Sequence, residues 1–276
     1  GVQTCALPIS NTVGGNNTAV GFNAMYYNTS SNNVAMGYKA LFTNTTGTQN
    51  VAIGQVALTY NTTGLYNTAV GAGSLQNNTT GVYNTALGYA ALISTTIGYY
   101  NTGCGMQSFQ SNITGVGNTG LGFQTGYTNS SGSYNIFIGQ QAGYNNTSAD
   151  YNTGVGYQAM YSNTTGDQNT GVGWGVLYSN STGSYNTGFG SQALKGISNG
   201  QGNVGIGVNV LRDNNASYNV GIGLNVLVSS SGSYNVAVGS TSMFASTTGG
   251  YNVAVGTSSL YCNTAGINNA GMGYQS

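Results

Sequence analysis

The chain has 276 residues, no histidine, and only three cationic and three anionic side chains, so its formal net charge is zero. A neutral chain cannot neutralise a row of phosphates, which argues against nucleic-acid binding by counterion release. No run of apolar residues is long enough for a transmembrane helix, so we expect no membrane span. Without histidine, imidazole catalysis and His-ligated metals are also excluded.

Residues 1–10 differ in character from the rest of the chain. They contain the only proline, Pro8, and one of three cysteines, Cys5. Their letters resemble an in-frame translation of a common DNA-sequencing adapter, so we expect this segment to be non-native. Residues 11–276 are then expected to form a single repeat domain that is cut in mid-repeat at both ends.

One phrase, Asn-(Thr/Val)-(Ala/Gly)-apolar-Gly, recurs sixteen times at a spacing of 17 residues, occasionally 16. We number each repeat from its Asn, which is position one. A short period held over the whole chain predicts a stack of identical structural units. The repeats begin at Asn17, Asn33, Asn50, Asn67, Asn84, Asn101, Asn118, Asn135, Asn152, Asn169, Asn186, Asn203, Asn219, Asn235, Asn252 and Asn269.

Each phrase predicts one short β-strand. Position two is mostly β-branched, position three is Ala or Gly in every repeat except at Phe137, and position five is always Gly. A β-rich run bounded by Gly is typical of a strand of three or four residues. Because position four is always apolar, we expect it to form the core column: Val20, Met36, Ile53, Val70, Leu87, Cys104, Leu121, Ile138, Val155, Val172, Phe189, Ile206, Ile222, Val238, Val255 and Met272.

A second apolar cluster, such as Ala57-Leu58 or Ala91-Leu92, follows four or five residues after the phrase and predicts a second short strand. Asn-Thr-Thr-Gly segments, such as the one starting at Asn61, are typical of turns. The predicted fold is therefore all-β: a parallel β-solenoid, or β-roll, of about sixteen 17-residue coils. The small side chains of position three either form a strip for a neighbouring chain, which favours a homo-oligomer, or relieve crowding inside one coil.

The phrases Asn50-Val51-Ala52-Ile53-Gly54 and Asn67-Thr68-Ala69-Val70-Gly71, each followed by an Ala/Ser-Leu pair, resemble the head repeats of trimeric autotransporter adhesins. They are also similar to the longer repeats of bacterial and viral tail-fibre-like proteins. The resemblance extends from Asn17 to Tyr274. It implies a left-handed roll, assembly as a homotrimer, and a location outside the cell, on the cell surface or in a virion tail.

Two further columns are candidate functional surfaces. The residue before the repeat Asn is often Tyr, which favours either stacking between coils or contact with sugars: Tyr66, Tyr83, Tyr100, Tyr134, Tyr151, Tyr185, Tyr218, Tyr234 and Tyr251. The turn segments contain Asn-x-Ser/Thr sequons, which are either glycosylation acceptors or simply turn residues: Asn28, Asn44, Asn61, Asn78, Asn112, Asn129, Asn146, Asn163 and Asn180.

Catalytic chemistry is not indicated. Asp150 and Asp167 occupy equivalent positions of adjacent repeats, where they could hold a cation or, more simply, be solvated turn residues. We expect no enzyme activity, no cofactor and no metal.

The sequence predicts a structural, adhesive fibre segment that contacts cell-surface glycans or a host surface weakly and many times. The alternatives are an ice-binding solenoid and an architectural filament without a ligand. We expect the Thr of position two to point inward, which counts against ice binding.

Overall fold

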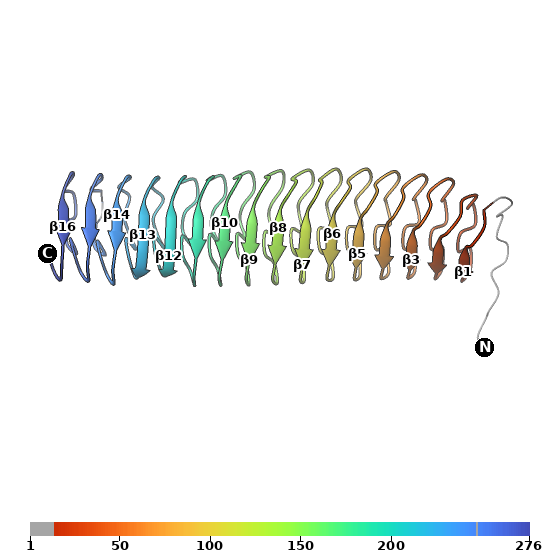
Figure 1. Ribbon diagram of the computed structural model, residues 1–276, viewed down its shortest axis with the longest axis horizontal. Helices are drawn as coiled ribbons and strands as arrows, with labels where there is room; N and C mark the ends of the chain where they lie inside the picture. Colours follow the sequence, from red (N-terminus) through yellow and green to blue (C-terminus); the bar gives the residue numbers. More distant parts are fainter. Residues whose placement is uncertain (1–13, 247) are drawn as a thin grey trace. The chain divides into compact units, whose positions relative to one another are not determined.

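The computed structural model describes residues 14–246 and 248–276, so the segment 1–10 lies outside the described residues. The chain divides into two units, one ending at Asn135 and one running from Ile136 to Ser276. In each unit every repeat forms one coil that contributes one short strand, and the strands of successive coils are parallel neighbours (Figure 1). The predicted all-β parallel solenoid is therefore confirmed. The described residues contain no helix, and hence none that is long and apolar enough to cross a bilayer.

In the first unit, equivalent positions of successive repeats pair directly, for example Thr68 with Thr85 and Val70 with Leu87. Every strand spans positions two to four, as predicted. The strands are β1 (Thr18–Val20), β2 (Val34–Met36), β3 (Val51–Ile53), β4 (Thr68–Val70), β5 (Thr85–Leu87), β6 (Thr102–Cys104) and β7 (Thr119–Leu121).

The second unit repeats this arrangement. Two of its strands extend to five residues, where Val204 pairs with Val220 and Val208 with Leu224. The strands are β8 (Ile136–Ile138), β9 (Thr153–Val155), β10 (Thr170–Val172), β11 (Thr187–Phe189), β12 (Val204–Val208), β13 (Val220–Leu224), β14 (Val236–Val238), β15 (Val253–Val255) and β16 (Ala270–Met272).

The inside and the outside of the strand are reversed relative to the prediction. Position three is the buried one: Ala35, Ala52 and Ala69 are fully buried. The predicted core column at position four lies on the outer face and is wrong. Its side chains are exposed or half-buried, with Met36 at 42% and Leu121 at 50% exposed. The position-four residues that are exposed or half-buried in this way are Val20, Met36, Ile53, Val70, Leu87, Cys104, Leu121, Ile138, Val155, Val172, Phe189, Ile206, Ile222, Val238, Val255 and Met272.

The narrow interior of the coil explains this reversal. A Cβ atom built at Gly103 would lie 3.1 Å from Cγ of Leu92, and one at Gly205 would lie 3.0 Å from Cγ of Leu194. The leucine side chains thus reach across the coil to the back of the strand. Even an Ala would press on the leucine in these two coils, and in coils that carry Ala, such as that of Ala69, no larger side chain fits, because protein interiors are close-packed. Position three therefore relieves crowding inside one coil, and it offers no strip to another chain.

The second apolar cluster lies on the inner wall, as predicted, but it forms a turn and not a strand. Ala57 and Leu58 are fully buried, and the segment around them has no strand pairing. Its backbone is left-handed at position seven, as at Val56 (φ 53°), and at position nine, as at Leu58 (φ 50°). The amide of Val56 donates to Tyr38 in the preceding coil, whereas that of Leu58 donates to Ser74 in the following coil. These two hydrogen bonds tie the turn to both neighbouring coils without strand geometry.

Position five needs Gly for two reasons. At Gly54 φ is +134°, in a region that L-residues rarely adopt. A Cβ atom there would lie 2.6 Å from the carbonyl oxygen of Gly71 in the next coil. The positive φ and the close approach each exclude a side chain at this position.

The single large residue at position three, Phe137, compensates for a missing leucine. In its coil, position nine is Gly143 instead of Leu, Met or Phe. Phe137 is fully buried, and a Cβ atom at Gly143 would overlap its ring. The ring therefore occupies the space that Leu58 or Leu177 occupies in other coils. The core of this coil is therefore filled by a side chain from the strand, whereas in most other coils a side chain from the turn fills it.

Candidate functional site

The predicted glycosylation column is a buried amide ladder. The side chain of Asn61 is fully buried, and its Nδ2 atom donates to Asn44 Oδ1 at 2.8 Å and to the Gly64 carbonyl at 3.0 Å. An attached glycan would replace one of these donors and require access from solvent. The glycosylation prediction is therefore wrong for Asn28, Asn44, Asn61, Asn78, Asn112, Asn129, Asn146, Asn163 and Asn180, all of which are fully buried.

A second ladder runs through the Asn residues of position one. The backbone amide of Asn67 donates to Asn50 Oδ1 at 3.0 Å, and Asn67 Nδ2 donates to the Gly81 carbonyl at 2.8 Å. Asn78 of the first ladder donates to the same Gly81 carbonyl at 3.0 Å. The loop glycine therefore ties the two ladders together. Buried polar groups that are paired in this way hold the coils in a fixed register.

The first ladder is interrupted where its Asn is replaced. Asn78 precedes Thr95 at position twelve, and Asn180 precedes Ile197. Within the described residues, the Oδ1 atoms of Asn78 and Asn180 have no hydrogen-bond donor. The next coil simply lacks the amide that would donate to them. Such buried unpaired acceptors cost stability.

The predicted tyrosine column is both stacked and exposed. The rings of Tyr66 and Tyr83 are 4.8 Å apart with planes within 2°, and those of Tyr234 and Tyr251 are 4.9 Å apart within 10°. Each ring also faces solvent, with Tyr251 at 60% exposed. The exposed column comprises Tyr66, Tyr83, Tyr100, Tyr134, Tyr151, Tyr185, Tyr218, Tyr234 and Tyr251. Stacking and surface display are thus compatible.

A second aromatic row was missed in the sequence. It lies at position ten, where Tyr144, Tyr161 and Tyr178 stack with ring centroids 5.1 and 5.2 Å apart. The signal that could have found it is the same 17-residue spacing, applied to the residue after the buried Leu or Met. Its side chains are half-buried and lie beside the turn, away from the exposed tyrosine column.

The outer face of the strands carries two rows that point to solvent. Position two supplies Thr in many coils, including the paired Thr68, Thr85 and Thr102. Position four supplies apolar side chains, such as Leu87 at 38% exposed. The expectation that the threonines point inward is therefore wrong. This surface is mixed, with hydroxyls beside a row of apolar groups of unequal size.

The few charged residues lie in turns and at the surface. The backbone amide of Asp150 donates to Asp167 Oδ1 at 2.8 Å, and that of Asp167 donates to Ser184 Oγ at 3.0 Å. The two aspartates therefore lie on adjacent coils, and the Asp167 carboxylate accepts from the backbone of the preceding coil. The described residues contain no cluster of three His, Cys, Asp or Glu side chains. Arg212 and Asp213 pair at 2.7 Å on the surface, where such a pair contributes little.

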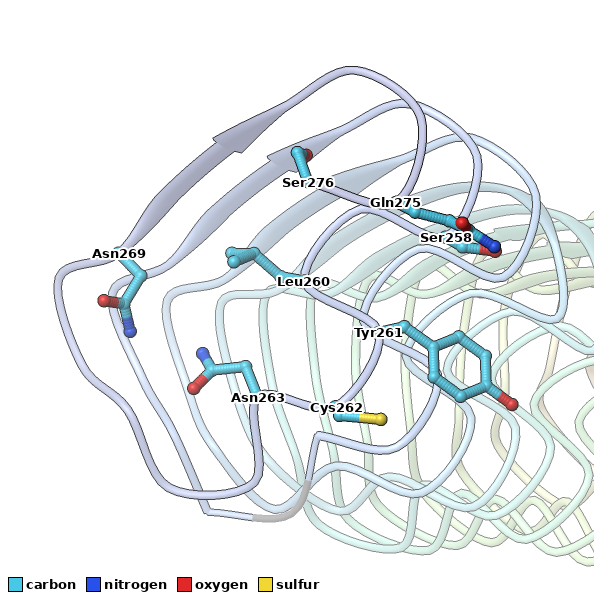
Figure 2. Close-up of a pocket in the computed structure, with 8 residues that line it drawn as sticks. All are labelled: Ser258, Leu260, Tyr261, Cys262, Asn263, Asn269, Gln275 and Ser276. Atoms are coloured by element: carbon cyan, nitrogen blue, oxygen red, sulfur yellow. The ribbon is translucent and has the colours of Figure 1, made fainter.

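A hollow of about 760 Å³ lies beside the coil of β16 (Figure 2). Leu260, Asn263 and Asn269 line it, together with Tyr261 and Ser276. In earlier coils, the residues equivalent to these three are buried beneath the following coil, as Leu58, Asn61 and Asn67 are. The hollow is therefore the uncovered end of a coil, and it contains no group that distinguishes it from the solenoid interior.

Comparison with protein-family models, with curated proteins and with solved structures gives no match for this chain.

Proposed function

We propose that this chain is a structural and adhesive segment of an extracellular fibre, displayed at a cell surface or in a virion tail. The exposed tyrosine column is the observation that supports this proposal. Its rings repeat at 4.8 to 5.2 Å, for example from Tyr66 through Tyr83 to Tyr100. A tyrosine presents an apolar ring face together with a hydroxyl, which suits sugars and polar protein surfaces. Many weak contacts of this kind add up to useful avidity.

The outer strand face supports self-association, for which we propose a homotrimer. Soluble monomers rarely expose continuous apolar patches of this kind. Here Met36 of β2, Ile53 of β3 and Leu87 of β5 are exposed, and Val70 of the intervening β4 is half-buried. A second and a third copy of the chain would cover these rows. Because position three is buried, the contact runs through positions two and four of the strands.

Ice binding is the second candidate, because rows of Thr at position two face solvent in register. A flat face with regular spacing is needed to order water. The neighbouring row at position four varies in size, from Cys104 beside Leu121 to Phe189 beside Ile206. This irregularity favours a partner surface over an ice lattice. A filament without any ligand is the remaining alternative.

Three measurements distinguish these proposals. Sedimentation equilibrium should give a molecular mass three times the 28.0 kDa of one chain. Leu87→Lys should lower this mass to that of one chain, whereas the control Thr63→Lys should leave it unchanged.

A glycan array should show weak binding that Tyr83→Ser reduces. The matched control is Tyr60→Ser, since Tyr60 is equally exposed but lies outside the column and has no ring contact among the described residues. Strong retention in ice by a monomer would overturn the adhesive proposal, and silence on the array together with visible fibres would support the filament.

A further inference from the structure

A row of amide side chains at position seven is interrupted by one glycine. Gln158 Nε2 donates to Gln141 Oε1 at 3.0 Å, and Gln192 occupies the same position two coils after Gln158. Between them lies Gly175. The backbone is unchanged there, because the Gly175 amide donates to Tyr157 at 3.0 Å and the Gln192 amide donates to Trp174 at 2.9 Å. The interruption is therefore a gap, one side chain wide, in this row of amide side chains.

The gap is open. A Cβ atom built at Gly175 would have no atom within 4 Å. The φ of Gly175 is 60°, close to the 52° of Gln158 and the 57° of Gln192, so the backbone would accept a glutamine. The cavity has a volume of about 280 Å³, near the lower end for small-molecule pockets. It is lined by Gln158, Trp174, Gly175, Tyr178, Gln192 and Lys195.

The two glutamines offer one acceptor and one donor across the gap. Where two glutamines follow one another in this row, the Oε1 atom of one accepts from the amide of the next, as Gln107 does from Gln124 at 2.9 Å and Gln141 does from Gln158 at 3.0 Å. Gly175 supplies no such amide to Gln158, and the Gln192 side chain has no hydrogen-bond partner among the described residues. An acceptor facing a donor is the combination that vicinal hydroxyl groups satisfy, since each hydroxyl both donates and accepts.

An indole ring forms the next part of the wall. Trp174 is 50% exposed and makes no ring contact with another aromatic side chain among the described residues. In the next coil, position six is the small Ser191, whose carbonyl accepts from the amide of Asn209. A small neighbour leaves that side of the indole uncovered. A broad aromatic face with a polar surround suits a ring that is apolar on one face and polar at its edge.

A cation completes the site. Lys195 lines the cavity and forms no ion pair among the described residues. The neighbouring cation Arg212 is already bound to Asp213 through two hydrogen bonds of 2.9 and 2.7 Å. The lysine charge is therefore uncompensated in a half-enclosed cavity, where it attracts an anion more strongly than in bulk water.

We propose that this notch, defined by Gln158, Trp174, Gly175, Gln192 and Lys195, binds one carboxylated sugar ring of the uronic-acid type. The ring packs on Trp174, its hydroxyls bridge the two glutamines, and its carboxylate pairs with Lys195. The notch occurs once in the described coils and acts independently of the exposed tyrosine column.

The chain contains a matched comparison at Gly73, which also interrupts position seven. There the flanking residues of position seven are Val56 and Ala90, which carry no amide side chain, and the glutamines that line the cavity, Gln55 and Gln76, come from other positions. The cavity is smaller, about 210 Å³, and no cation lines it. Ile93 Cδ1 would lie 3.4 Å from a Cβ atom at Gly73 and partly fills the space. A gap alone is therefore not the site, and we expect no sugar binding at Gly73.

Trp174 is the only tryptophan of the chain, so its emission reports this site alone. The full chain is titrated with sodium glucuronate, with glucose, and with sodium acetate. We expect a saturable change in emission with glucuronate that weakens as salt is added, and at least about tenfold weaker responses to glucose and acetate. An equal response to acetate, or no response to glucuronate, would overturn the proposal.

Two variants test the assignment to the notch. Gly175→Gln restores the regular row and keeps Trp174, so it should fold and lose the response to glucuronate. Gly73→Gln fills the other gap and should leave the response intact. Lys195→Met should abolish the preference for glucuronate over glucose, which provides a second test if Gly175→Gln fails to fold by circular dichroism. Retained binding of glucuronate by Gly175→Gln would contradict the assignment of the site to this notch. Loss of the glycan-array signal that depends on the exposed tyrosine column would bear on the proposed function and not on the notch.

Discussion

The Nδ2 atom of Asn61 lies 2.8 Å from the Oδ1 atom of Asn44 in the preceding coil, inside a fully buried row of amides. Asn61 in turn supplies the acceptor for Asn78, and Asn61 and Asn78 each also donate to the glycine carbonyl three residues further along the chain. The repeat is therefore held together by its polar interior as well as by its leucines. Replacing one amide affects two coils.

Completing this ladder should stabilise the protein. Thr95→Asn would place an amide beside Asn78 Oδ1, which lacks a donor, and would remove the Thr95 Oγ1 atom, which is also unpaired. Its own Oδ1 could accept from Asn112, whose Nδ2 now donates only to Gly115. We expect a gain of about 1–2 kcal/mol in the free energy of unfolding, measured with urea.

The control for that variant is Thr63→Asn, because Thr63 is exposed and outside the ladder. It should change the free energy of unfolding by less than about 0.5 kcal/mol. A destabilised Thr95→Asn would mean that the amide cannot enter the row at this coil.

Glycans should be absent from the nine buried sequons. A glycan at Asn61 would have to displace the hydrogen bonds to Asn44 and Gly64. When the chain is expressed in a glycosylating host, mass spectrometry of the soluble, folded fraction should find these sequons unmodified. Asn215, in the sequon Asn215-Ala216-Ser217, is exposed and serves as the internal comparison. Soluble, cooperatively folding protein that carries a glycan at Asn61 would refute the buried ladder.

Gly54 should tolerate no side chain. In Gly54→Ala the new Cβ atom would lie 2.6 Å from the Gly71 carbonyl, at a φ of +134°. We expect a loss of at least about 2 kcal/mol in the free energy of unfolding. Gly175→Ala is the matched control, since its Cβ atom would meet nothing within 4 Å and its φ of 60° costs only about 1 kcal/mol. Equal effects of the two variants would contradict the close approach of the coils.

Phe137 and Gly143 should be strongly coupled. Phe137→Ala leaves a cavity and should cost about 3–5 kcal/mol. Gly143→Leu would overlap the Phe137 ring and should also destabilise. The double variant restores the Ala and Leu of the other coils, so it should recover most of the lost stability. A double-mutant cycle by urea unfolding measures this coupling, and simple additivity would show that the two side chains do not share one space.

Much of the fold follows from the sequence. The strand at positions two to four, the parallel pairing of successive repeats and the glycine of position five are all visible in the 17-residue period. The strand parity was wrong because alternation alone does not say which face is inside. The size of the residues could have decided it, since a column restricted to Ala and Gly indicates the side with least space. Ala69 is buried and Val70 is not, because Leu58 and Leu75 fill the interior.

The sites were harder to predict than the fold. Asn61-Thr62-Thr63 has the same letters whether its amide is buried or exposed, so the sequon could not reveal the ladder. The notch arises because Gly175 lacks a side chain where its neighbours carry glutamine, and a missing side chain leaves no recognisable motif in the sequence. Only the coil register, which places Gln158 and Gln192 on either side of Gly175, brings these residues together.

The most direct test of this account is hydrogen exchange of the asparagine side-chain amides, followed by NMR. The buried ladders predict that the Nδ2 protons of Asn61, Asn67 and Asn78 exchange only through global unfolding, with the same denaturant dependence as the backbone amides of the strands. The exposed Asn199, whose Nδ2 atom donates no hydrogen bond among the described residues, provides the unprotected reference. Exchange of Asn61 and Asn67 as fast as that of Asn199, in a protein that remains folded, would contradict the claim that amide ladders hold the coils together.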